Sequence, residues 1–471
     1  MNHADMLLHV RGESRYIDDQ PLPAGGLFAA VCPSRTAHAR LTGIDTRAAT
    51  ALPGVVAIFT AADIPGENQI GGIVADEPLL ADGEVHFLGQ PVALVVATTA
   101  ATARDAVRAI QLDEEPLPAV FDPRMAFRKG MLIIPPRTFS CGDPDSAWAE
   151  CDVIVEGTVE TGGQEHLYLE TQSALARYDE GGKVHVASST QSPTSVQRTV
   201  ARILGLPMNQ VETETLRLGG GFGGKEDQAT PWATLAALAA WKLKRPVKLV
   251  LNRGEDLRMT GKRHPYSSDF RLGLNSEGKI LAYEVLFYQN AGAAADLSPA
   301  ILDRTLFHAT GSYAIPHVRA TGFCCRTNLP PFTAFRGFGG PQGMFVIESA
   351  IDKAARFLGL PAWEIQRRNL LQEGDKFYYG QPVTACRAGR CWHEAERTFH
   401  FDDLDRRLRR FNETHATEKK GAARMPLAFG ISFTNTFLNQ AGALVHVYSD
   451  GSVGVSTGAV GQLQTAYVLT S

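Results

Sequence analysis

A run of glycines followed by two charged residues is the first segment whose residue types could do chemistry. Residues 218–226 read LGGGFGGKE; they follow the strand-like residues 211–217 and precede a helix expected from about Asp227. Glycines let main-chain N–H groups approach a ligand closely, and a helix N-terminus behind them favours anionic groups. The segment therefore predicts a loop that binds a ligand through its backbone, with a flexible surface loop as the simpler alternative.

Two nucleotide-binding hypotheses for this loop fail on its neighbours. Gly219, Gly221 and Gly224 fit the G-x-G-x-x-G pattern, but no βαβ unit with a ribose-binding acid surrounds them. Gly219, Gly224 and Lys225 begin a P-loop, and Glu226 then stands where a P-loop has Ser or Thr. A carboxylate at that position repels phosphates and cannot supply the hydroxyl that binds magnesium.

A second glycine-rich segment, TAFRGFGGPQG at residues 333–343, places an arginine and an aromatic residue between glycines. Such a backbone can bend around a ligand, with the Arg336 guanidinium donating hydrogen bonds as a fork. A structural loop with Phe338 in the core is an equally good interpretation of this segment alone.

A third segment resembles a metal-binding cluster. Residues 162–171, GGQEHLYLET, hold Gln164, Glu165 and His166 in a row. Glu165 and His166 are adjacent, however, and adjacent side chains point to opposite faces of a strand. These residues therefore favour a hydrogen-bonding role over metal ligation.

The elements that must position these segments are those of an α+β fold with mostly antiparallel or mixed sheets. Apolar runs at residues 55–59 and 92–96 predict buried strands. Alternating runs on either side of Gly, Asp or Asn turns predict three antiparallel hairpins, at residues 173–178 with 184–188, 270–274 with 280–288, and 444–448 with 453–456. Helices are expected at residues 98–110, 194–204, 347–358 and 363–371.

Composition and charge exclude several classes of protein. The 46 basic and 50 acidic residues give a net charge of −4 without a basic block, which speaks against a nucleic-acid partner. The mixed charges of residues 402–410 indicate a solvated helix face. The seven cysteines include no C-x-x-C pair, which argues against a disulfide framework, a zinc site or an iron–sulfur cluster. Without a visible export signal or membrane-spanning run, we expect a cytoplasmic protein with no membrane contact.

Six segments together resemble the xanthine dehydrogenase family in content and order. They are GGQEHLYLET (162–171), STQ (189–191), LGGGFGGKE (218–226), DRTLFH (303–308), TAFRGFGGPQG (333–343) and FGISFTNTFLNQAGALVHVYSDGSV (429–453). The resemblance runs from His9 to about Ser456. It implies an α/β hammerhead domain at residues 1–121, a linker at 122–144, a first molybdopterin-binding domain at 145–385 and the beginning of a second, incomplete one at 386–471.

The resemblance also implies the residues on the cofactor side. Gln191 would hydrogen-bond an oxygen ligand of molybdenum. Phe222, with Gly223 beside it, would contact the metal centre through its main chain, and Arg336 would lie next to the cofactor. The implied cofactor is molybdenum–molybdopterin, with 2Fe–2S clusters and FAD expected on partner chains, an iron–sulfur subunit and an FAD-binding subunit.

On the substrate side the resemblance implies a purine pocket. Glu226 and Arg304 would grip opposite edges of the ring, while Phe338 and Phe433 would sandwich its faces, with Thr434 beside the second aromatic. A flat heterocycle gains most from one offset-stacked and one edge-on ring. Arg304 could stabilise negative charge that develops on the ring, and burial would push Glu226 towards its protonated form. The implied reaction is oxidation of hypoxanthine or xanthine with water as the oxygen source.

The final residues depart from the family pattern. A Glu-Met-Gly-Gln-Gly run is expected after Val453, but residues 456–464 read STGAVGQLQ, in which Gln462 alone has a counterpart. The family's general-base glutamate lies further on and is absent before Ser471, so no catalytic residue is assigned. We therefore expect either a component completed by a separately encoded chain or a truncated, inactive fragment. An aldehyde- or N-heterocycle-oxidising relative is a third hypothesis, which the pairing of Glu226 with Arg304 disfavours.

Overall fold

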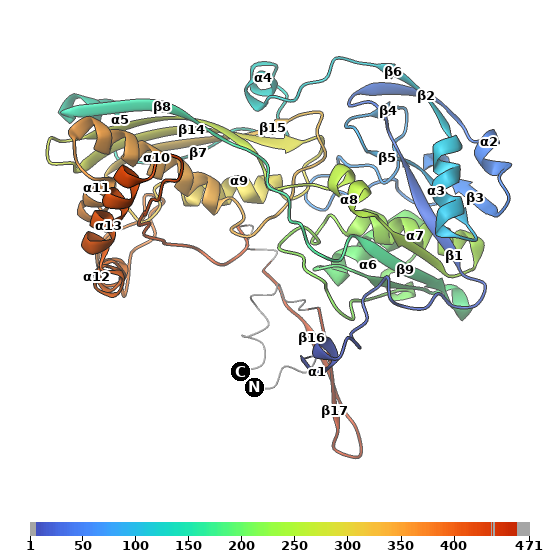
Figure 1. The fold of residues 1–471 in the computed structure, drawn as a ribbon. Coiled ribbons are helices and arrows are strands. Elements are labelled where there is room, and N and C mark those ends of the chain that lie inside the picture. The colour runs from blue at the N-terminus through green and yellow to red at the C-terminus, as the bar shows by residue number, and fades with distance from the viewer. Residues whose placement is uncertain (1–5, 435, 437–438, 459–471) are drawn as a thin grey trace.

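The computed structural model describes residues 6–434, 436 and 439–458, so Gln462 and the tail around it lie outside the described residues. Two lobes lie side by side, each built on its own large sheet (Figure 1). The first lobe contains a seven-stranded and a three-stranded sheet, and the second lobe contains a five-stranded sheet. Both large sheets mix parallel and antiparallel pairs, in agreement with the predicted α+β class.

The seven-stranded sheet joins strands from distant parts of the chain. Its order is β11-β10-β9-β12-β1-β5-β3, and β1 pairs in parallel with β12 through Leu27 and Val247. The sheet therefore crosses the boundary expected at residue 121. Its strands are β1 (Leu27–Pro33), β3 (Val55–Phe59), β5 (Pro91–Ala97), β9 (Ser173–Tyr178), β10 (Val184–Ser188), β11 (Val211–Glu214) and β12 (Val247–Val250).

Helices complete the first lobe. The helix α6 ends at Gly205, which adopts the left-handed conformation that glycine favours. The helix α7 is buried at every position from Thr230 to Ala240, because it packs against β9, β10, β12 and α6. The helices of this lobe are α2 (Arg47–Thr50), α3 (Ala100–Ala109), α6 (Pro193–Leu204), α7 (Thr230–Leu243) and α8 (Arg253–Met259), and the small sheet is β4 (Glu84–Val85), β2 (Ala39–Asp45) and β6 (Gln111–Pro116). The short helix α1 (Met6–Val10) has no buried residue and lies outside the lobe (Figure 1).

The second lobe has the strand order β7-β15-β14-β13-β8. Residues 122–144, expected as a linker, contain α4 and the strand β7, which pairs antiparallel with β15. The prolines and glycine that flank β7 give these residues the composition of a loop, although they form a sheet edge. The elements of this lobe are α4 (Pro123–Arg128), β7 (Arg137–Cys141), α5 (Pro144–Ala147), β8 (Val153–Thr161), β13 (Tyr266–Leu274), β14 (Ile280–Gly292), α9 (Ser298–Phe307), β15 (His317–Arg326), α10 (Gly340–Leu358) and α11 (Ala362–Arg368).

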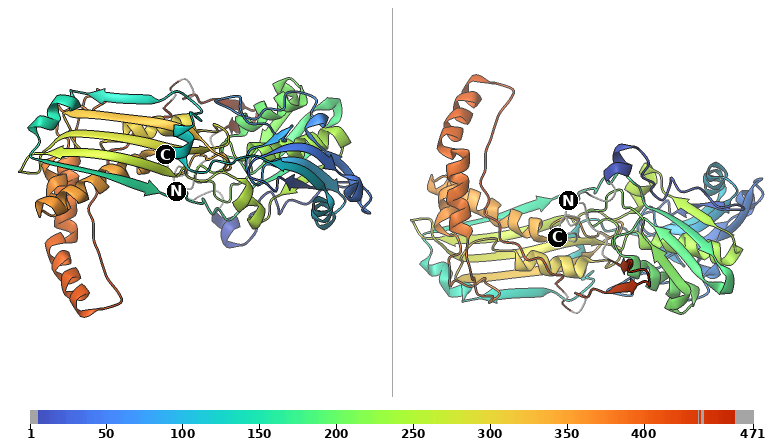
Figure 2. Two further views of the ribbon diagram at one scale, coloured as in Figure 1. Left: turned by 90° about the horizontal axis from the view of Figure 1, so that it is seen from above. Right: turned by 90° about the horizontal axis from the view of Figure 1, so that it is seen from below.

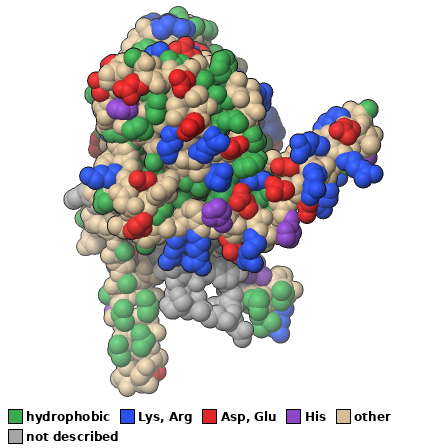
Figure 3. All heavy atoms as spheres, turned by 90° about the vertical axis from the view of Figure 1, so that its left-hand side faces the viewer, with side chains coloured by type: hydrophobic (Ala, Val, Ile, Leu, Met, Phe, Trp, Pro, Cys, Tyr) green, Lys and Arg blue, Asp and Glu red, His purple; other side chains and the backbone are tan. Residues whose placement is uncertain are grey.

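Two features project from the lobes. The helices α12 (Ala388–Phe399) and α13 (Phe401–Thr414) form an arm (Figure 2) on which basic and acidic side chains intermingle (Figure 3). No residue of α13 is buried, which confirms the solvated face predicted for residues 402–410. The strands β16 (Ala443–Val447) and β17 (Val453–Thr457) form an exposed antiparallel hairpin, and all three predicted hairpins are present. Among the described residues, every helix is too short or too polar to cross a bilayer.

Candidate functional site

The glycine loop is packed into the first lobe and is not a flexible surface loop. The N–H of Gly219 donates to Glu170 Oε2 at 2.7 Å, and Gln172 Nε2 donates to the carbonyl of Gly224 at 2.9 Å. A Cβ added at Gly224 would lie 2.6 Å from the His166 ring. Protein atoms of residues 162–172, not only a ligand, therefore require glycine in this loop.

Lys225 is the buried anchor of the loop. Its side chain is 0% exposed, and Nζ donates to the carbonyl of Glu170 at 2.7 Å and to Ser189 Oγ at 2.6 Å. Burial lowers the pKa of Lys225 to about 8, and the nearby Glu170 carboxylate opposes that shift. Lys225 thus points into the protein, where it ties together three of the segments singled out in the sequence: 162–171, 189–191 and 218–226.

Gln191 is fixed by the same loop. Its Oε1 accepts hydrogen bonds from the N–H groups of Gly223 at 3.0 Å and Lys225 at 3.2 Å. Because the oxygen is engaged, the amide presents its NH₂ group as a donor. In the part of the chain that the structure describes, this NH₂ group has no partner.

Phe222 and Arg336 meet at the far side of the loop. Phe222 has a φ of +55°, which is uncommon for a residue with a side chain, and its carbonyl accepts from the N–H of Arg336 at 2.9 Å. Within the described ranges, the N–H groups of Gly221 and Phe222 and the Arg336 guanidinium have no acceptor. Gln191, Phe222 and Arg336 thus lie together, with the Gly223 N–H holding the Gln191 amide. The donors without a partner among the described residues, namely the Gln191 NH₂ group, the N–H groups of Gly221 and Phe222 and the Arg336 guanidinium, we call the donor cluster.

Phe338 and Phe433 also converge. Their ring centroids are 5.4 Å apart with the planes inclined at 54°. The two rings pack with Leu297, which directly precedes α9, with Ile301 of α9 and with Ala334. We call them the aromatic pair. The rings contact each other directly, so a flat heterocycle can lie between them only if one ring moves.

Arg304 is engaged by the chain itself. Its guanidinium donates to the carbonyls of Gly430 and Ser432, and only 5% of the residue is exposed. Thr434 Oγ1 donates to the carbonyl of Ala300 on α9 at 3.0 Å. Residues 429–434, the docked segment, are therefore fastened along α9 by hydrogen bonds at both ends.

Glu226 belongs to a group of acids that are buried, as Asp296 is, or half-buried, as Glu226 itself is. Burial, reinforced by the charges of Asp227 and Asp296, raises the pKa of Glu226 to about 8, as the expected protonated form requires. Burial also raises the pKa values of Asp227, Asp296 and Glu77. No hydrogen bond or ion pair joins Glu226 to Arg304 among the described residues.

Asp296 connects the parts of the site, although nothing in the sequence singles it out. It accepts from Thr333 Oγ1 at 2.6 Å and from Gln228 Nε2 at 2.9 Å. Its neighbour Leu297 packs against the aromatic pair. Asp296 thus links the start of α7, the segment 333–343 and the start of α9, and only three-dimensional contacts reveal this.

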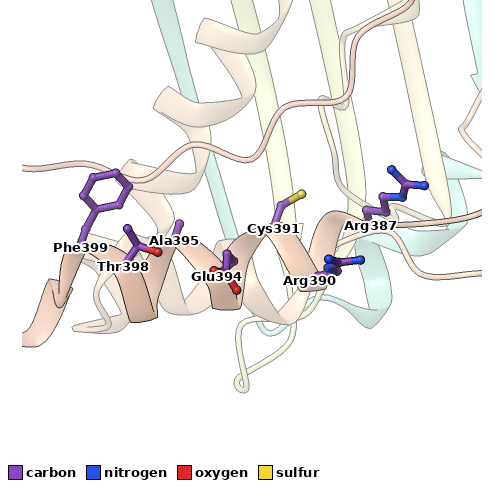
Figure 4. A pocket seen from close by; sticks show the side chains of 7 residues that line it. All are labelled: Arg387, Arg390, Cys391, Glu394, Ala395, Thr398 and Phe399. Carbon is purple, nitrogen blue, oxygen red and sulfur yellow. The ribbon is translucent and has the colours of Figure 1, made fainter.

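The adjacent Glu165 and His166 have satisfied roles. Glu165 forms an ion pair with Lys262 at 2.7 Å, and His166 Nε2 lies 2.7 Å from the carbonyl of Ala334. The hydrogen-bonding interpretation is confirmed. A shallow hollow of about 460 Å³ on α12 (Figure 4) shares no residue with the candidate site.

Family models match most of the chain. The molybdopterin cofactor-binding domain matches residues 129–370, a second molybdopterin cofactor-binding domain matches residues 394–467, and the a/b hammerhead domain of aldehyde oxidase and xanthine dehydrogenase matches residues 11–118. The chain belongs to the xanthine dehydrogenase family.

Individual relatives agree with that assignment. The chain is 43% identical to xanthine dehydrogenase 2 of Arabidopsis thaliana over 97% of its length, and 41% identical to the xanthine dehydrogenase/oxidase of Felis catus over 96%. It spans about a third of the length of these relatives, 34% in both cases.

Solved structures share the fold. Quinoline 2-oxidoreductase from Pseudomonas putida 86 aligns with a TM-score of 0.84 and 25% identity, covering 98% of this chain and 62% of that one. Aldehyde oxidoreductase from Desulfovibrio gigas aligns with a TM-score of 0.84 and 26% identity, covering 96% and 51%.

The donor cluster fits the cofactor of this family. The N–H groups of Gly221 and Phe222, the Gln191 amide and the Arg336 guanidinium have no acceptor among the described residues, so each can donate a hydrogen bond to an anionic, oxygen-bearing group. Close packing against residues 166 and 334 holds the loop in place behind them.

Proposed function

We propose that this chain is the molybdopterin-binding part of a xanthine-dehydrogenase-like hydroxylase that oxidises purines such as hypoxanthine and xanthine. The observation that carries the proposal is the position of the aromatic pair, which packs on α9 and whose Phe338 follows Arg336 of the donor cluster by two residues. A flat substrate held there would lie next to the group that the donor cluster holds.

The chain's own residues have distinct tasks in this proposal. Bound molybdenum–molybdopterin supplies the oxidation chemistry, with water as the source of oxygen. Gln191, the Phe222 backbone and Arg336 hold and orient it. Glu226, protonated below about pH 8, donates a hydrogen bond to a ring nitrogen.

Arg304 has the role of stabilising charge on the substrate. Its guanidinium now binds the carbonyls of Gly430 and Ser432, so substrate would have to replace at least one of them. An anionic ring oxygen offers a stronger, charge-assisted hydrogen bond than a neutral carbonyl, which favours the exchange. Electrons would leave through 2Fe–2S clusters and FAD on partner subunits or domains.

Substrate-dependent dye reduction by the assembled, molybdenum-loaded complex tests the proposal. We expect turnover with xanthine, a loss of roughly 10²-fold or more in kcat/KM for Arg304→Met, and unchanged kinetics for Arg356→Met, whose side chain on α10 is 80% exposed. Molybdenum content measured on the same samples separates loss of cofactor from loss of substrate recognition. A fully loaded complex that ignores purines contradicts the proposal.

Oxidation of aldehydes or other N-heterocycles is the second candidate. The engagement of Arg304 by main-chain carbonyls favours it, because a substrate without an anionic oxygen needs no free guanidinium. In that case Arg304→Met would leave aldehyde or quinoline turnover intact, and the wild-type complex would oxidise those substrates in preference to xanthine.

A further inference from the structure

We propose that His38, Glu84 and His86 form a binding site for one divalent transition-metal ion, with Zn²⁺ the best match. One ligand atom from each residue lies within 4.8 Å of the other two. The site lies in the three-stranded sheet of the first lobe (Figure 1) and is independent of the proposed function.

Strand register explains why the three side chains meet. β2 and β4 pair antiparallel with Ala39 opposite Val85 and Arg40 opposite Glu84. The next position in the same register sets His38 opposite His86. Glu84 and His86 are two residues apart, and alternate residues of a strand share a face. The backbone therefore presents two imidazoles and a carboxylate on one side of the sheet.

The hydrogen bonds prepare His38 as a ligand. Its Nδ1 lies 2.7 Å from the carbonyl oxygen of Pro118, which can only accept, so Nδ1 carries a proton. The other ring nitrogen, Nε2, points at Glu84 Oε1, 2.9 Å away. Two acceptors face each other at that distance unless a proton or a metal ion lies between them. A carbonyl that accepts from the second ring nitrogen is the usual support of a metal-binding histidine.

His86 completes the arrangement. Its Nδ1 lies 3.4 Å from the same Glu84 oxygen, so one carboxylate oxygen faces both imidazoles. Its main chain is held by Gln90 Oε1 at 2.7 Å and Asn328 Nδ2 at 2.9 Å. The nearby cation Arg326 is paired with Asp76 at 2.8 Å.

The donor set selects the metal. Two imidazole nitrogens and one carboxylate oxygen are ligands of Zn²⁺, which binds three protein groups and a water, whereas Ca²⁺ and Mg²⁺ prefer oxygen alone. The side chains are 20%, 45% and 45% exposed for His38, Glu84 and His86, so an ion can enter. A bound ion would fasten the two-residue edge strand β4 to β2 and, through Pro118, to the end of β6.

Titration of the EDTA-treated chain with Zn²⁺, followed by calorimetry, and with Co²⁺, followed by visible absorption, tests the proposal. We expect one ion per wild-type chain. Removal of a ligand in His38→Asn or His86→Asn should weaken binding roughly 100-fold or more, since loss of a supporting hydrogen bond alone costs about 10–100-fold. His393→Asn is the matched control, because His393 faces Glu396 at 3.4 Å on α12 but belongs to no group of three metal-ligating side chains among the described residues.

Thermal unfolding distinguishes a variant that has lost a metal ligand from one that has not folded. In EDTA the variants should unfold at the wild-type temperature, and Zn²⁺ should raise the unfolding temperature of wild type and His393→Asn only. If a histidine variant does not fold, Glu84→Gln, which keeps the side-chain shape, takes its place. Equal Zn²⁺ uptake by wild type and ligand variants, or none by wild type, overturns the proposal.

Discussion

The two halves of the candidate site are held in different ways. The donor cluster rests on a loop whose glycines touch protein atoms and whose Lys225 is buried against Glu170 and Ser189. The aromatic pair instead depends on the docked segment, which reaches α9 from far along the chain and is attached by hydrogen bonds from Arg304 and Thr434.

The glycine loop is therefore the fixed half of the site, and the docked segment is the half that can move. The loop is fixed by interactions that form with the core of the first lobe, so its geometry does not depend on a ligand. The docked segment is attached to α9 by only a few hydrogen bonds, so under the proposed function the substrate side is the part of the site that can move more easily.

The strongest test of the fixed half is Lys225→Met. Removing one partner of a buried ion pair leaves Glu170 without its cation, which should lower the free energy of unfolding by about 3–5 kcal/mol. Chemical denaturation measures this, with the exposed Lys242→Met on α7 as the control, expected within about 0.5 kcal/mol of wild type. A change below 1 kcal/mol would mean that the loop does not need its anchor.

Gly224→Ala probes the packing of the same loop. The added methyl group meets the buried His166 ring at 2.6 Å, which should cost about 1–3 kcal/mol of unfolding free energy. Gly162→Ala is the matched control, because nothing lies within 4 Å of its added Cβ. Equal effects of the two substitutions would show that the contact with His166 is easily relieved.

The pH dependence of stability probes the border between the halves, where Glu226 lies. Its folded pKa of about 8 lies above the unfolded value, so its contribution is fully present below about pH 4.5 and is lost as pH rises through 8. Relative to Glu226→Gln, wild type should lose up to about 1.4 kcal/mol per pH unit within this window. Replacement of the exposed Glu212 by Gln serves as the control. If the difference in unfolding free energy between wild type and Glu226→Gln stays constant from pH 5 to 8, Glu226 is not held in its neutral form by the fold.

The smallest expected effect is in the half that can move. A double-mutant cycle with Phe338→Ala and Phe433→Ala should give a coupling of about 0.5–1.5 kcal/mol, as for other aromatic pairs. Phe345, half exposed on α10, replaces Phe433 in the control cycle and should show no coupling to Phe338. Coupling above 2 kcal/mol would make the docked segment as firmly held as the loop.

Local patterns predict the fold well where partners are neighbours in sequence. Alternation around tight turns gives the three hairpins, and the α6 helix ends at Gly205 as its sequence indicates. The pairing of β1 with β12 has no local signal, because its partners lie on opposite sides of residue 121. For the same reason β7 is hidden among prolines until β15 is placed beside it.

The site divides in the same way. Glycines, Gln191 and the aromatic residues lie in recognisable segments, and burial predicts the protonated state of Glu226. Asp296 and the group of His38, Glu84 and His86 escape sequence analysis, because each depends on contacts between distant residues. The resemblance points to Arg304, but neither its helix α9 nor its hydrogen bonds to the carbonyls of Gly430 and Ser432 were predicted from the sequence.

The shared seven-stranded sheet has a consequence for synthesis on the ribosome. Strand β1 can pair with β5 early, yet its other edge must wait for β12, since Leu27 meets Val247. At 5–20 residues per second, synthesis of the chain from Leu27 to Val247 takes roughly 10–45 s. During this time the edge of β1 that later pairs with β12 is unpaired. A translation pause between residues 97 and 247 would therefore prolong the period in which a chaperone or another nascent chain can bind this edge in place of β12.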